Sequence, residues 1–211
     1  MEKAYKFRIY PNKIQGDLLA QTFGNCRFVH NHFLAKKQKL YADSKESMSY
    51  NQCCAELIKL KKEFEWLCIS DKFALQNTLR DLDTAYTNFF KKRTDYPNFK
   101  SKKTHRHSYR TSYTNNNIEF LGKYIKLPKL GYVKTRDKFV PQGRILNATI
   151  SQEPSGKYYC SICCTDVEIE PMPKTGALVG IDLGIKDFAI TSDGVKIENP
   201  KYLSKSLDKL A

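Results

Sequence analysis

Long apolar runs are missing from this sequence of 211 residues, and the N-terminus lacks the apolar stretch of a secretory leader. No run approaches the roughly 20 residues of a membrane-spanning helix, so no membrane partner is expected. The seven cysteines are odd in number and irregularly spaced, which does not suit a disulfide framework. We therefore expect a cytoplasmic protein with reduced thiols. Hydrophobic residues make up 41% of the chain, enough for one large packed domain or two small ones.

Acidic side chains are scarce in residues 91–136. This segment has 13 basic residues and 2 acidic ones, a net charge of +11 (13 − 2) out of +14 for the chain. A basic patch confined to one region is typical of polyanion binding, because each neutralised phosphate releases counterions. Within it, residues 98–113 interleave basic and aromatic side chains, which suits phosphate contact and base stacking. The alternative is a solvated charged loop, although such a loop would normally mix both signs.

Helical periodicity predicts three helices, over residues 13–40, 50–64 and 70–92. Gly24 lies inside the first and is expected to mark a bend or a break. Ser70 is the expected N-cap of the third helix, with Asp71 in its first turn.

The third predicted helix has two distinct faces. Its apolar stripe steps by three and four residues and should face a core; it consists of Leu75, Leu79, Leu82, Tyr86 and Phe89. Another face carries Lys72, Gln76 and Arg80 at successive turns. This row either lies against DNA or is an ordinary hydrated helix face, and spacing alone favours the second interpretation.

Short strand-like stretches dominate the rest of the first 175 residues. They cover residues 3–10, 118–121, 124–128, 130–135, 144–152 and 157–164. Their length and the intervening Gly, Pro and Asn predict a small antiparallel barrel, with the helices as an insertion. A C-x2-C pair, Cys160 and Cys163, has no second pair to complete four zinc ligands, so we expect core or sheet residues there.

The stretch LVGIDLGIKDFAITSDG (178–194) is interpreted as a β-hairpin that carries Asp182 at the end of an apolar strand. A carboxylate in such a place is costly unless it holds a cation or is paired. Ribonuclease H-like nucleases place a carboxylate there to hold two Mg²⁺ or Mn²⁺ ions. Actin-like folds cradle nucleotide phosphates with a similar hairpin, but Ser or Thr would be expected where Ile185 stands. A surface aspartate is the third possibility.

Taken together, these stretches resemble the insertion-sequence TnpB (OrfB) family, the RNA-guided nucleases related to type V CRISPR effectors. The matching pieces are YKFRIYPNKIQ (5–15), GNCRFVHN (24–31), LQNTLRDLDTAYTNFFKK (75–92), YPNFKSKK (96–103), LPKLG (127–131), GKYYCSI (156–162) and GIDLGIKDFAITSDG (180–194). They run in order and span nearly the whole chain, like the N-terminal half of such a protein.

The resemblance implies an α+β fold. A small antiparallel β-barrel, the wedge, would comprise residues 1–10 and 96–175, and a helical recognition bundle would be inserted at residues 11–95. The first hairpin of a RuvC, ribonuclease H-like fold would occupy residues 176–211. The implied partners are a guide RNA and double-stranded target DNA, with activity near the bacterial nucleoid.

The resemblance also implies site residues. Lys72 and Gln76 match the pair that contacts a short target-adjacent DNA motif, and Tyr50, Thr111 and Ser112 are weaker candidates. The candidates for contact with RNA or a nucleic-acid backbone are Arg80, Lys91, Lys92, Arg93, Lys100, Lys102, Lys103, Arg106, Arg110, Lys123 and Lys126.

Asp182 matches the first RuvC carboxylate, a ligand for Mg²⁺ or Mn²⁺. The family's second and third acids, and the four-cysteine zinc ribbon before the third, have no counterpart in these 211 residues. Two functions therefore stay open. The chain is either the N-terminal portion of an RNA-guided DNA endonuclease or a catalytically inactive RNA- and DNA-binding module of the same family.

Overall fold

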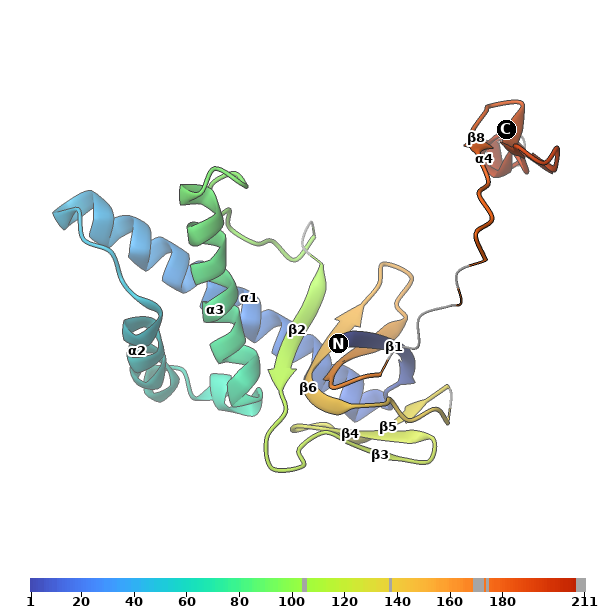
Figure 1. Ribbon diagram of the computed structural model, residues 1–211. Coiled ribbons are helices and arrows are strands. Elements are labelled where there is room, and N and C mark those ends of the chain that lie inside the picture. The colour runs from blue at the N-terminus through green and yellow to red at the C-terminus, as the bar shows by residue number, and fades with distance from the viewer. Residues whose placement is uncertain (104–105, 137, 169–172, 174, 208–211) are drawn as a thin grey trace. The chain divides into compact units, whose positions relative to one another are not determined.

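The computed structural model describes residues 1–103, 106–136, 138–168, 173 and 175–207 (Figure 1). The chain divides into two compact units, Met1–Ile169 and Glu170–Ala211, and each is described by itself. The first unit combines a sheet with helices and the second is a small three-stranded sheet with a short helix, so the fold is α+β as predicted. No helix in the described ranges has the length and apolar character needed to cross a membrane.

Seven antiparallel strands form the sheet of the first unit, in the order β2-β6-β7-β1-β5-β4-β3. Their bounds are β1 (Lys3–Tyr10), β2 (His107–Ser112), β3 (Glu119–Leu121), β4 (Tyr124–Leu127), β5 (Gly131–Thr135), β6 (Arg144–Gln152) and β7 (Tyr158–Thr165). The N-terminal strand lies in the middle, where Phe7 is opposite Cys160 of β7 and Ile9 is opposite Thr135 of β5. A strand that opens the chain thus joins the two halves of the sheet.

The sheet is open, so the expected closed barrel is wrong for the part of the chain described here. The edge strands β2 and β3 do not pair with each other. At the β2 edge the helix that contains Asn77 packs against the strand where a further strand could pair. The Asn77 side chain donates a hydrogen bond of 2.9 Å to the backbone carbonyl of Arg110 on this edge. Covering an edge in this way satisfies its polar groups without closure.

The expected sheet positions of the cysteines near residue 160 are confirmed. Cys160, Cys163 and Cys164 all lie on β7, where side chains alternate between the two faces. Cys160 and Cys164 are fully buried, and burial raises the pKa of the Cys160 thiol to about 12. Cys160 therefore stays a protonated, apolar core residue at neutral pH.

The first helix, α1 (Lys13–Ser44), is continuous, so of the two alternatives expected at Gly24 the break is wrong. Asn12 caps it in a reciprocal pair of hydrogen bonds with Gln15. A glycine inside a helix costs about 1 kcal/mol, but buried residues on both sides of it, Phe23 and Cys26, hold this helix against the core. Packing therefore outweighs the local preference.

Two further helices and a 3₁₀ turn, η1, complete the first unit: α2 (Tyr50–Glu63), η1 (Glu65–Ile69) and α3 (Lys72–Phe90). The predicted stripe of α3 is confirmed for its three leucines, which are almost completely buried. The N-cap of α3 is Asp71, not Ser70 as expected, and its carboxylate accepts a hydrogen bond from the Ala74 amide. Ser70 instead ends η1, an element that helical periodicity did not predict.

Strand β2 lies in the segment that we expected to be a basic and aromatic contact region. Its residues alternate, with Tyr109 and Thr111 buried between more exposed neighbours. The Tyr109 ring packs 5.8 Å from the ring of Phe23 on α1. Tyr109 is therefore a core residue and is not available for base stacking.

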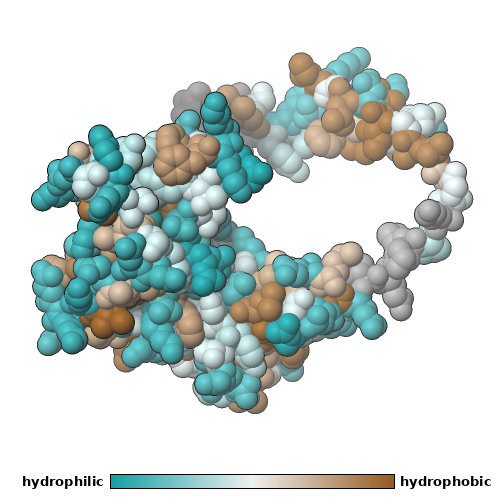
Figure 2. Space-filling view, turned by 60° about the vertical axis from the view of Figure 1, so that its left-hand side comes forward, coloured by the Kyte–Doolittle hydropathy of each residue, from teal (hydrophilic) through white to brown (hydrophobic). Residues whose placement is uncertain are grey.

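The second unit contains β8 (Ile181–Asp182), β9 (Asp187–Thr191), β10 (Lys196–Glu198) and α4 (Tyr202–Leu207). Its strands are antiparallel, in the order β10-β9-β8. Among its described residues only Ala189 is buried, whereas Leu178 and Ile185 are 98% and 91% exposed. Figure 2 shows how apolar side chains gather on the surface of this unit. The hairpin thus forms without an apolar core of its own.

Candidate nucleic-acid interface

The row on α3 lies on the outside of the helix, as its spacing predicts. Lys72 and Arg80 are exposed and Gln76 is half-buried. The guanidinium carbon of Arg80 lies 5.2 Å from the centre of the Tyr50 ring, a cation–π distance. The structure therefore brings Tyr50, the first residue of α2, beside this row.

The N-terminus of α3 is fixed to β2 by a buried carboxylate. Asp71 accepts a 2.6 Å hydrogen bond from the Thr111 hydroxyl in addition to the bond from Ala74. Thr111 is fully buried, so its side chain holds α3 in place instead of facing solvent. The neighbouring hydroxyl of Ser112 is half-buried and accepts a hydrogen bond of 3.2 Å from Asn77. Of these two wedge-side candidates, Ser112 is the more accessible.

A polar pocket of about 190 Å³ opens where α1, α3 and β2 meet. Its basic lining residues are Arg27, Lys100, Arg106 and Arg110. Arg110 forms a 2.6 Å ion pair with Asp81, which also lines the pocket. Because Asp81 is already paired with Arg110, it is not paired with the other three basic side chains of the pocket. This composition suits an anion such as phosphate.

Lys100 is a half-buried basic group of this pocket. Burial lowers the pKa of its ammonium, and Asp81 acts in the opposite direction. Among the described residues Lys100 forms no ion pair within 4.0 Å. A half-buried cation without an ion-pair partner gains most from a bound anion, because the anion replaces hydration that burial has removed.

The backbone around Lys100 is held on α1. The Asn31 side chain donates to the Lys100 carbonyl at 2.9 Å and accepts from the Lys100 amide at 2.8 Å. Two residues earlier in the same segment, the Asn98 carbonyl lies 3.2 Å from Nε2 of His30. These contacts hold the backbone at residues 98–100 against α1, at the start of the stretch that carries most of the basic cluster.

We call Lys100, Lys102, Lys103, Arg106 and Arg110 the basic cluster. Lys102, Lys103 and Arg106 are exposed and line a second hollow with His107. The basic cluster therefore lines the polar pocket and this second hollow near the start of β2.

The other basic candidates lie elsewhere. Lys91, Lys92 and Arg93 are exposed immediately after α3. Lys123 is exposed in the β3–β4 turn, and Lys126 of β4 lies 3.7 Å from Glu119. Four strands separate β4 from β2 in the sheet order, so the sheet does not place these two lysines next to the basic cluster.

Asp182 is exposed at the end of β8, opposite Ile190 of β9. The apolar strand that carries it is not buried, because Ile181 and Leu183 on either side of Asp182 are themselves exposed. Among the residues that the structure describes, no three His, Cys, Asp or Glu side chains come together as a metal-binding group.

Two residues of this interface were not predicted from the sequence. Arg27 reaches the polar pocket from the middle of α1, and Asn77 links α3 to β2. Arg27 stands in an ordinary helical sequence and carries no recognisable signal. Asn77 is a buried polar residue on a helix, but only the structure shows that its partner is a strand edge.

Comparison with known proteins identifies relatives of this chain. A family described as a helix-turn-helix domain, of the OrfB IS605 type, matches residues 1–46. In the structure these residues form β1 and the single helix α1, so the matched residues do not form a helix-turn-helix.

Two similar proteins match nearly the entire chain. A Streptomyces pristinaespiralis protein named "Putative RNA-guided DNA endonuclease" is 35% identical over 100% of this chain and 53% of its own length. An Escherichia coli K12 protein with the same name and the designation InsQ is 32% identical over 99% of the chain and 52% of its own length. The virulence protein VsdF of Salmonella dublin is 32% identical over 48% of the chain and 95% of its own length.

The chain thus spans about half the length of the two relatives that match it throughout. The motifs found in the sequence, the OrfB match and these relatives agree with one another. The chain belongs to the insertion-sequence TnpB (OrfB) family and matches the N-terminal part of such a protein.

Proposed function

We propose that this chain binds guide RNA and double-stranded target DNA as the N-terminal portion of an RNA-guided DNA endonuclease. The observation that carries the proposal is the junction of α3 and β2. There a polar pocket lined by four basic side chains lies on one side of α3, and another, outer face of the same helix carries residues suited to base contact. The names of the two longest-matching relatives support the same partners.

We propose that the outer row of α3 contacts a short DNA motif. The amide of Gln76 suits a paired contact with adenine, and the ammonium of Lys72 suits guanine or a phosphate. Arg80 lies beside Tyr50 and adds a charge for the DNA backbone. Because Asp71 and Asn77 hold α3 on the sheet edge, the row is presented on a rigid support.

The RNA is proposed to lie along the basic cluster and the sheet. Phosphates would be neutralised at the polar pocket and at Lys102 and Lys103, with Lys123 and Lys126 as separate contacts across the sheet. RNA bound through phosphates in this way has an affinity that falls steeply with salt.

Asp182 is proposed as the first carboxylate of a RuvC-type nuclease unit, where Mg²⁺ or Mn²⁺ would activate water and stabilise the leaving oxygen. The described residues do not fit a complete two-metal site, because no group of three metal-binding side chains includes Asp182. We therefore derive no catalytic step from it.

A second candidate function is a binding module that holds RNA and DNA without cutting. This candidate uses only the basic cluster and the outer row of α3 and needs no metal site. Both candidates require the same nucleic-acid interface, so the tests below apply to either.

Replacing Gln76 with alanine should remove the preference of the chain for adenine at one position of its DNA motif. A paired base contact contributes about 1–3 kcal/mol of discrimination, so the preference should fall by roughly 5- to 150-fold. The measurement is selection of bound duplexes from a DNA library randomised over a short window, followed by sequencing.

Gln21→Ala is the matched control, because Gln21 is an exposed glutamine on α1, outside this row. It should leave the selected motif unchanged. Identical motifs for wild type and Gln76→Ala would contradict the role of Gln76. A wild-type chain that selects no motif would contradict DNA motif contact altogether.

A further inference from the structure

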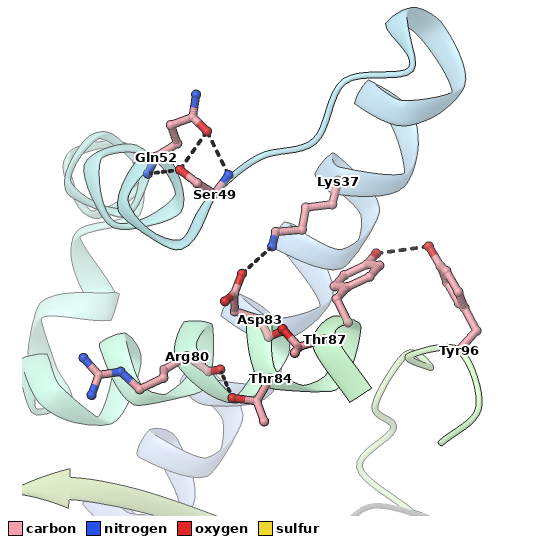
Figure 3. A network of polar contacts seen from close by, with 9 residues as sticks. Lys37, Ser49, Gln52, Arg80, Asp83, Thr84, Thr87 and Tyr96 are labelled. Carbon is pink, nitrogen blue, oxygen red and sulfur yellow. Dashed lines mark hydrogen bonds and ion pairs between the residues drawn. The ribbon is translucent and has the colours of Figure 1, made fainter. Parts of the chain in front are cut away.

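A third hollow lies near the C-terminal end of α3, and the interface described above does not use it. Its volume is about 380 Å³, and its walls come from α1, the loop between α1 and α2, α3 and the segment after α3. Five aromatic side chains line it: Tyr41, Tyr86, Phe89, Phe90 and Tyr96. We call it the aromatic hollow. In Figure 3 the Arg80 side chain points away from Asp83, which lies on the hollow's side of α3.

Three of these rings form a fixed wall. Tyr96 meets Phe89 edge-on with centroids 5.1 Å apart, and meets Tyr86 at 90° with centroids 5.6 Å apart. The hydroxyl groups of Tyr86 and Tyr96 lie 3.0 Å apart in a hydrogen bond, drawn in Figure 3. Burial together with this contact raises the pKa of Tyr86, so its hydroxyl stays neutral.

The other two rings are largely uncovered. Phe90 is 75% exposed and Tyr41 is 59% exposed. Burying an aromatic ring is favourable, so an exposed ring represents stabilisation that the isolated chain does not gain. Exposed aromatic side chains beside a hollow are typical of binding surfaces. The hollow thus combines a rigid aromatic wall with two rings free to stack on a ligand.

The lining of the aromatic hollow contains one basic residue and two acidic ones, and further basic residues lie beside it. Lys37 is paired with Asp83 at 3.4 Å and also lies 5.1 Å from the centre of the Tyr86 ring. Lys45 lies 5.1 Å from the Tyr41 ring, and Glu46 is the one further acidic lining residue among those described. The run Lys91, Lys92 and Arg93 follows Phe90 directly and is exposed.

This composition indicates the kind of ligand. Aromatic rings stack on any unpaired base, while nearby basic side chains neutralise the phosphates on either side of it. An apolar protein segment would match the rings but leave this basic run without partners. The charge therefore favours a nucleic-acid strand.

We propose that the aromatic hollow binds an unpaired base of an RNA strand, whose backbone runs along Lys91, Lys92 and Arg93. The inference rests on the proposed function, in which the target DNA meets the chain as a duplex and the RNA supplies unpaired bases. It adds a stacking site at the end of α3 opposite to its capped N-terminus.

The test is the affinity of the 211-residue chain for an RNA oligoadenylate, measured by fluorescence anisotropy at fixed salt. Phe90→Ala should weaken binding about tenfold, because one stacked base is lost. Inorganic polyphosphate, which has charge but no bases, should bind both proteins equally. Tyr202→Ala is the matched control, since Tyr202 is 76% exposed on α4 of the second unit and does not line the hollow; it should bind like wild type.

Each other outcome overturns a defined part of the account. Unchanged oligoadenylate affinity in both Phe90→Ala and a Tyr41→Ala, Phe90→Ala double variant would refute the stacking site while leaving the proposed function intact. A larger loss for deoxyoligoadenylate than for RNA would refute the assignment to RNA. A wild-type chain that binds no RNA at any salt concentration would contradict the proposed function itself.

Discussion

Neutralising the basic cluster with five glutamine substitutions is expected to lower the affinity of the chain for RNA on the order of a hundredfold at physiological salt. Each lysine or arginine that contacts a phosphate of a single strand adds about 0.7 to the slope of log affinity against log salt. Five lost contacts should therefore reduce this slope by about 3.5. Fluorescence anisotropy titrations over a range of salt concentrations measure both quantities.

A control with the same change in net charge separates local contact from general attraction. It replaces five exposed lysines outside the cluster: Lys3, Lys13, Lys39, Lys59 and Lys62. This variant should keep most of the affinity and the slope. Equal losses in the two variants, or no loss in the cluster variant, would contradict an interface at the junction of α3 and β2.

The cluster variant should remain folded, which circular dichroism can verify. Its substitutions include Arg110→Gln, which breaks the ion pair with Asp81. Both partners are more than one-third exposed, so that pair contributes less than about 1 kcal/mol to stability.

The largest expected effect on stability comes from Leu75→Ala. Leu75 is fully buried in the inner stripe of α3, and α3 packs on α1 and β2. Removing a buried leucine side chain costs about 2–5 kcal/mol, because the apolar burial is lost and a cavity remains. For a unit of this size the midpoint of thermal unfolding should fall by about 10 °C, which calorimetry or circular dichroism can measure.

Leu121→Ala is the matched control, since Leu121 is 61% exposed on the edge strand β3. It should change the unfolding midpoint by no more than about 2 °C. If Leu75→Ala were as mild as Leu121→Ala, α3 could not be the packed support on which the proposed DNA contact depends.

Strong periodicity explains which parts of the fold were predictable. The leucines of α3 repeat every three or four residues, and the alternation in residues 3–10 marks β1. Tyr86 and Phe89 continue the stripe of α3 but are only half-buried, because they line the aromatic hollow. Helical spacing identifies a face and does not distinguish a core from a pocket.

The missed features depend on contacts between distant residues. Strand β2 was not predicted, because basic side chains surround Tyr109 and Thr111 and obscure their alternation. Thr111 can be buried there since Asp71, 40 residues away in the sequence, accepts its hydroxyl hydrogen. The continuity of α1 through Gly24 and the open sheet likewise depend on packing between distant residues, which a local sequence pattern cannot predict.

The candidate interface was predictable to a similar extent. Helical spacing placed Lys72, Gln76 and Arg80 on one outer face, and charge counting located the basic segment. That Tyr50 lies beside Arg80, or that Arg27 enters the polar pocket, follows only from how the helices pack.

Ultraviolet cross-linking of bound RNA to the 211-residue chain, with mass spectrometry of the linked peptides, tests the central claim most directly. The account predicts that most linked peptides come from residues 91–113, which carry the basic cluster and the basic run beside the aromatic hollow. Cross-links confined to α2 and to the second unit, with none in residues 91–113, would contradict it.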